Sequence, residues 1–101
     1  MRKAALAQGI YFIATGLWPI MHMRSFLAVT GPKTDTWLVK TVGGLIAAVG
    51  LALLVDESKT LAIASAAALG AADAYFAGTG RISKVYLADA AVEAGLVCAW
   101  L

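Results

Sequence analysis

The sequence contains a single cysteine, Cys98, and a single histidine, His22. One cysteine leaves no partner for an internal disulfide and cannot build a cysteine-based metal cage. Only 14% of the residues are charged, and the basic ones form no patch with interleaved aromatic residues, so we expect no nucleic-acid binding. The sequence also lacks an HExxH motif, a phosphate-binding glycine loop and a nucleophile triad, which leaves hydrolase and nucleotide chemistry without support.

Apolar residues are abundant instead. They make up 61% of the 101 residues, against about 45–50% in soluble domains. A soluble domain of this size could not hide so much apolar surface, because small folds leave a large fraction of their surface exposed. We therefore expect the lipid bilayer to be the environment of this chain.

Four apolar segments are long enough to cross a bilayer, and short polar turns join them. They cover about residues 3–29, 36–55, 58–78 and 83–101. The sequence predicts an all-α fold, an antiparallel four-helix bundle in one transmembrane domain over residues 1–101. Pro19 is expected to kink the first segment or to end its regular part near Leu17. Thr34, Asp35 or Thr36 can cap the second segment.

Small residues in the third segment recur at steps of four. They are Ala62, Ala66, Gly70, Ala74 and Gly78. This small-xxx-small ridge predicts close helix packing along the whole segment, with Asp73 lying off it. The second segment has further small residues, at Gly43, Ala47 and Gly50. Together these surfaces are compatible with a homodimer.

The last segment is as apolar as a membrane span, yet it contains Asp89 and Glu93. Four residues apart on a helix, the two carboxylates share one face, where like charges repel. Ionisable groups within a span are costly and mark functional sites by default. The two groups cannot both ionise cheaply, so a proton, an organic cation or a metal ion could each compensate them.

Antiparallel threading gathers further polar residues in the same half of the bundle as this pair. We predict that a ligand or proton is bound by Asp73, Asp89, Glu93, Tyr86 and His22. Arg24 and Lys40 are candidate counter-charges, and the structural alternative is an ion pair between them and the acids. Tyr86 also suits an aromatic belt at the interface. We interpret His22, within Met21-His22-Met23, as an interface histidine rather than a ligand of a soft metal, and we expect no metal and no cofactor.

Three short runs resemble those of small, uncharacterised bacterial four-span membrane proteins. They are Gly16-Leu17-Trp18-Pro19, Thr30-Gly31-Pro32-Lys33 and Tyr86-Leu87-Ala88-Asp89-Ala90-Ala91. This resemblance covers most of the chain and implies no activity. The layout of Asp73, Asp89 and Glu93 is loosely similar to that of DoxX-like and EXPERA-type bundles. The latter hold paired acids in a lipid-accessible cavity for sterol-like or cationic amphiphilic ligands, but no residue role is transferred from them.

Three functions follow as expectations. The first is binding, with or without translocation, of a small lipophilic or cationic ligand or of protons in a one-sided polar cavity. The second is an enzyme that acts on a lipid-like substrate by acid–base chemistry, and the third is a structural or assembly subunit of a membrane complex.

We expect the protein in the bacterial inner membrane. Arg2 and Lys3 precede an apolar run too long for a signal peptide, so the first span should stay uncleaved. Five basic residues on the side of the first and third turns, against three on the other, place both termini outside the cytoplasm. Dual insertion is the alternative.

Overall fold

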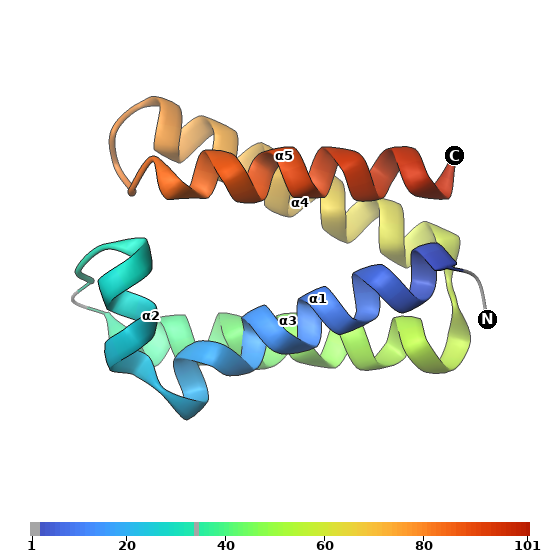
Figure 1. The fold of residues 1–101 in the computed structure, drawn as a ribbon, viewed down its shortest axis with the longest axis horizontal. Helices are drawn as coiled ribbons and strands as arrows, with labels where there is room; N and C mark the ends of the chain where they lie inside the picture. Colours follow the sequence, from blue (N-terminus) through green and yellow to red (C-terminus); the bar gives the residue numbers. More distant parts are fainter. Residues whose placement is uncertain (1–2, 34) are drawn as a thin grey trace. The chain divides into compact units, whose positions relative to one another are not determined.

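The fold is all-helical in the computed structural model, which describes residues 3–33 and 35–101 and has no strand in those ranges (Figure 1). The helices are α1 (Lys3–Met21), α2 (Met23–Thr30), α3 (Thr36–Asp56), α4 (Lys59–Gly78) and α5 (Val85–Trp100). Helices α1, α3 and α4 are long and apolar enough to cross a membrane. The all-α prediction is confirmed, and the three long helices are compatible with a multi-pass membrane protein. Helix α5 has 16 residues, which is about 24 Å of helix.

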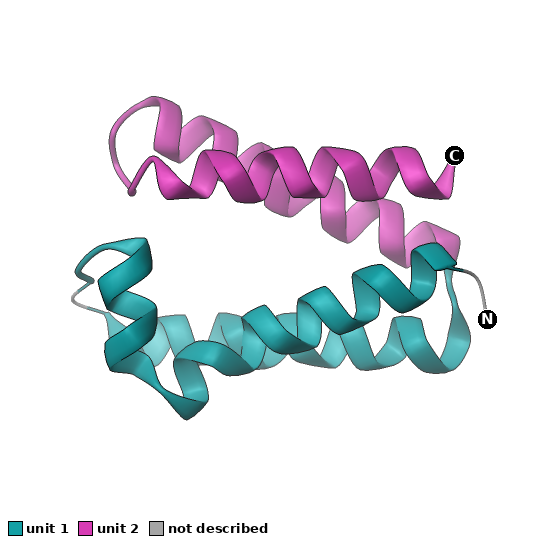
Figure 2. Ribbon diagram, viewed as in Figure 1, with its two compact units in different colours: residues 1–58 teal, residues 59–101 magenta. Residues whose placement is uncertain are grey.

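The chain divides into two compact units, residues 1–58 and residues 59–101 (Figure 2). In the first unit α1 packs along α3, and α2 follows α1 as a short additional helix. The second unit is a helical hairpin in which α4 packs along α5. Each unit is thus built around one pair of long helices.

The first apolar segment is two helices, and not the single span over residues 3–29 that the sequence predicts. Pro19 lies inside α1, and the helical backbone breaks at His22, with φ −152° and ψ 79°. Proline has no N–H to donate, which weakens the last turn of α1. His22 then starts α2 as its N-cap, because its Nδ1 accepts the backbone N–H of Ser25 at 3.2 Å. The Trp18 indole donates to the Ser25 hydroxyl at 2.8 Å and holds the corner in place.

Four glycines bring α1 and α3 into backbone contact. A Cβ atom added at Gly50 would lie 2.7 Å from the carbonyl oxygen of Gly9, and one added at Gly43 would overlap the carbonyl oxygen of Gly16. Real Cβ atoms do not approach backbone oxygens so closely, so a side chain at these positions would push the helices apart. The small residues of the second predicted segment thus find their partners at Gly9 and Gly16, a pairing that was not predicted.

The small-residue ridge of α4 is buried only in its first half. Ala62 and Ala66 are fully buried, whereas Ala74 and Gly78 are exposed. A step of four residues turns the helix by about 400°, so the ridge rotates by about 40° at each step and leaves the buried side. Asp73 and Ala77 occupy that side in the C-terminal half. This rotation places Asp73 on the buried side of α4.

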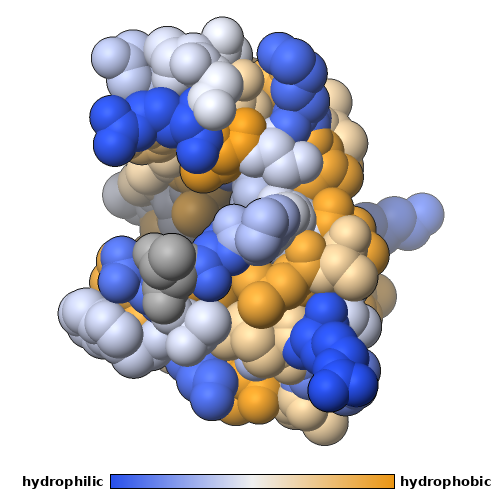
Figure 3. Space-filling model, turned by 90° about the vertical axis from the view of Figure 1, so that its left-hand side faces the viewer, coloured by the Kyte–Doolittle hydropathy of each residue, from blue (hydrophilic) through white to orange (hydrophobic). Residues whose placement is uncertain are grey.

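The turn between α4 and α5 is a compact glycine-containing cap. Gly80 has φ 81°, and the Arg81 N–H bonds to the Phe76 carbonyl oxygen at 2.9 Å, as in a Schellman motif. The Ser83 hydroxyl oxygen accepts the N–H of Val85 at 3.3 Å, next to Lys84, which is the N-cap residue of α5. Figure 3 faces this end of the second unit and shows hydrophilic residues in blue around the turn.

Capping of α3 is simpler. Asp35 is the N-cap residue, and its side chain makes no capping hydrogen bond. Thr34, the alternative cap, lies outside the described residues. Arg2, one of the basic residues counted for the orientation, also lies outside them.

Candidate functional site

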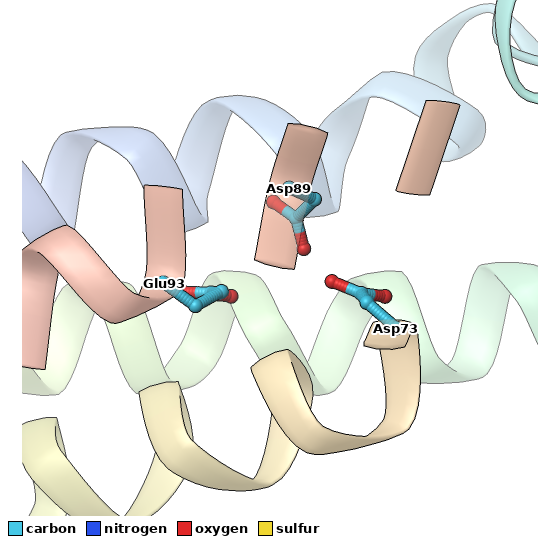
Figure 4. A group of neighbouring side chains, drawn as sticks. All are labelled: Asp73, Asp89 and Glu93. Carbon is cyan, nitrogen blue, oxygen red and sulfur yellow. The ribbon is translucent and has the colours of Figure 1, made fainter. Parts of the chain in front are cut away.

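Three carboxyl groups converge inside the second unit. Asp73 comes from α4, and Asp89 and Glu93 come from α5 (Figure 4). One oxygen atom from each residue lies within 4.8 Å of those of the other two. We refer to these three residues as the acid cluster.

Local helix geometry brings the acid cluster together. Asp89 and Glu93 are four residues apart and project from the same face of α5. Gly70 on α4 lets this face come close, because a Cβ added there would lie 3.1 Å from the Cβ of Glu93. Asp73 follows Gly70 by three residues, which is nearly one turn, and so faces the same pair.

The acid cluster is largely shielded from solvent. Asp73 is 8% exposed and Glu93 is 1% exposed, while Asp89 is half-buried. Among the described residues, Oδ2 of Asp73 and Oε1 of Glu93 are buried and have no hydrogen-bond partner. Buried polar atoms are nearly always satisfied, so two orphaned oxygens in one cluster require an explanation.

Three ionised carboxylates this close together would repel one another, because like charges that share a buried site cannot all ionise at low cost. A bound positive charge, a proton included, would reduce this repulsion.

Of the other predicted site residues, three belong to the first unit and one to the second. His22 is exposed, and its Nδ1 is hydrogen-bonded to the hydroxyl group of Ser25 at 2.7 Å. Arg24 and Lys40 are both exposed residues of the first unit, and their pairing with the acids stays a prediction. Tyr86 is half-buried on α5, one turn before Asp89.

A groove of about 290 Å³ runs along the seam between α4 and α5. Its lining is apolar, with alanines of both helices, Gly70 and Val97. No member of the acid cluster lines it, although Gly70 packs against Glu93 on one side of it. A lipid-like substrate in this groove would therefore contact apolar residues, because no acidic or basic side chain lines it.

The spacing of four glycines indicates the contact between α1 and α3, although this contact was not predicted from the sequence. Gly9 and Gly16 are seven residues apart, and so are Gly43 and Gly50. Seven residues are two helical turns, so equal spacings on two antiparallel helices allow both pairs to meet at once.

No family model, no curated protein and no solved structure matches this chain. The case for its function therefore depends on the acid cluster and on the apolar helices that carry it.

Proposed function

We propose that the protein is a four-span integral membrane protein that binds a small cationic species, protons included, at the acid cluster. The observation that supports this is the convergence of three carboxyl groups with two buried, unpartnered oxygens. In this proposal α5 is the fourth span, and the bacterial inner membrane is its location. Translocation of the bound species is part of the same proposal.

The burial of the acid cluster favours a positively charged ligand. Burying an ionised carboxylate without a partner costs several kcal/mol even after the surroundings relax. Asp73 and Glu93 each have a buried oxygen that no donor reaches among the described residues. A bound positive charge would offset this cost, and a ligand without charge would not.

The apolar helices support the membrane part of the proposal. Only 17% of the residues in the most apolar stretch of α3 are buried within the structure. Leu45, Leu51 and Val55 are all more than half exposed, at 65%, 57% and 71%. A large apolar surface of this kind is stable in lipid and would aggregate in water.

The enzyme alternative has less support. It needs an acid and a base that converge in a cavity with room for a ring system. The groove beside the cluster is lined by none of the acids, and His22 is engaged with Ser25 in the first unit. The structural-subunit alternative needs the acids to be neutralised by Arg24 or Lys40, both of which are exposed.

The test uses the purified protein in lipid nanodiscs. Thermal stability is measured with Ca²⁺, Na⁺ or tetraphenylphosphonium added, and the carboxyl bands of the infrared spectrum are titrated with pH. We expect at least one of these species to bind, because a ligand of the folded state raises its melting temperature. Asp89→Asn and Glu93→Gln should remove most of the response, and Asp56→Asn, at the exposed end of α3, should keep it. The proposal is wrong if none of the species binds, or if both cluster variants respond as the wild type does.

A further inference from the structure

The acid cluster has the spacing and the chemistry of a metal site. We propose that it binds one divalent metal ion of the size of Ca²⁺, with an oxygen from each of Asp73, Asp89 and Glu93 as ligands. This inference rests on the proposed cation binding and narrows it to one class of ligand. It replaces the expectation from sequence that no metal is bound.

The distances fit such an ion. Two oxygens on one ion can be no farther apart than twice the metal–oxygen distance, which for Ca²⁺ gives a limit of about 4.6–5.2 Å. The three ligand atoms all lie within 4.8 Å of one another. Mg²⁺ demands near-octahedral geometry at shorter metal–oxygen distances, about 2.0–2.1 Å. Ca²⁺, which tolerates irregular coordination, is the better match to two helices that already pack closely.

The two orphaned oxygens are independent evidence for a ligand. Asp73 and Glu93 are 92% and 99% buried by their exposed fractions of 8% and 1%, and each presents one oxygen without a hydrogen-bond donor. Figure 4 shows the carboxyl groups of Asp73 and Glu93 directed toward one another, with that of Asp89 directed toward the space between them. A metal ion in that space would satisfy both oxygens at once.

The donor set selects the class of metal. The cluster contains only carboxylate oxygens, and such hard ligands suit Ca²⁺, Mg²⁺ and Mn²⁺ rather than copper or zinc. A divalent ion also offsets more of the cluster's negative charge than Na⁺ or an organic ammonium does. Asp89, the half-buried member, is the one that an arriving ion meets first. Water would complete the six to eight oxygen ligands that Ca²⁺ usually takes.

The experiment is calorimetric titration of the nanodisc-embedded protein with CaCl₂ and, separately, with MgCl₂. We expect one Ca²⁺ per chain and weaker binding of Mg²⁺. Asp73→Asn, Asp89→Asn and Glu93→Gln should each lower the Ca²⁺ affinity at least about tenfold, a loss seen even for outer-shell partners of metals. Asp56→Asn is the matched control and should bind as the wild type does.

Neutralising a buried acid removes repulsion, so these variants should fold, and circular dichroism checks that they do. A wild-type protein that ignores Ca²⁺ but binds Na⁺ or tetraphenylphosphonium overturns this inference and leaves the proposed function standing. If none of these cations binds, both are wrong. Ca²⁺ binding that survives all three substitutions places the ion elsewhere and overturns the inference.

Discussion

Replacing Gly43 with alanine should destabilise the first unit, and the adjacent Gly44 provides a matched control. A Cβ at Gly43 would overlap the carbonyl oxygen of Gly16 and lie 3.2 Å from the Cγ of Pro19. A Cβ at Gly44 has Ile20 Cδ1 as its nearest neighbour, at 3.8 Å, which is an ordinary van der Waals contact. The two substitutions add the same methyl group to the same helix, one residue apart.

The magnitude follows from this contact. Overpacking typically costs about 1–3 kcal/mol, and a backbone oxygen cannot turn aside as a side chain can, so we take about 3 kcal/mol for Gly43→Ala. Alanine is better than glycine in a helix by about 1 kcal/mol, which leaves a net loss of about 2 kcal/mol. Gly44→Ala has only the favourable term. The two variants should therefore differ by about 3 kcal/mol in the free energy of unfolding.

The assay is reversible unfolding in mixed micelles with increasing sodium dodecyl sulfate, followed by circular dichroism. Gly43→Ala should unfold at a lower mole fraction of the denaturing detergent than the wild type, and Gly44→Ala at an equal or higher one. Equal stability of the two variants would refute the close approach of α1 and α3.

Two further predictions concern the acid cluster. Gly70→Ala should lower the Ca²⁺ affinity by about three- to tenfold. The added Cβ would lie 3.1 Å from the Cβ of Glu93 and would displace that side chain. A metal ligand that moves by a fraction of 1 Å no longer has the geometry that binding requires. Gly95→Ala is the control, since nothing lies within 4 Å of its added Cβ, and a Gly70→Ala protein that titrates like the wild type would contradict the packing of α4 on Glu93. The Ca²⁺ affinity should also rise with pH, because carboxylates bind metals in their deprotonated form, by up to about tenfold per pH unit for each proton that competes with the ion. Calorimetric titrations at a series of pH values measure this, and an affinity that falls with pH would contradict binding of the ion by carboxylates.

Much of the helical layout follows from hydrophobicity alone. Helices α3 and α4 begin and end within a residue or so of the predicted second and third segments, because charged or glycine-containing turns bound both. The break at His22 could not be predicted in the same way. It depends on hydrogen bonds among Trp18, His22 and Ser25, which hydropathy does not report.

The acid cluster was partly predictable. The spacing of Asp89 and Glu93 placed both on one face of a helix, and antiparallel threading put Asp73 in the same half of the bundle. Asp73 was predicted to lie off the ridge of small residues, on the assumption that residues four apart stay on one side of the helix. On a helix with about 3.6 residues per turn the ridge rotates, and Asp73 replaces Ala74 on the buried side.

Calorimetric titration of the wild type and Glu93→Gln with Ca²⁺ is the most direct test of the proposed divalent metal site. Glu93 is the most buried member of the acid cluster and has an oxygen without a hydrogen-bond partner. We expect one Ca²⁺ per wild-type chain and an affinity lower by about tenfold or more in Glu93→Gln. Equal binding by the two proteins, or no Ca²⁺ binding by the wild type, would contradict a metal site at the acid cluster.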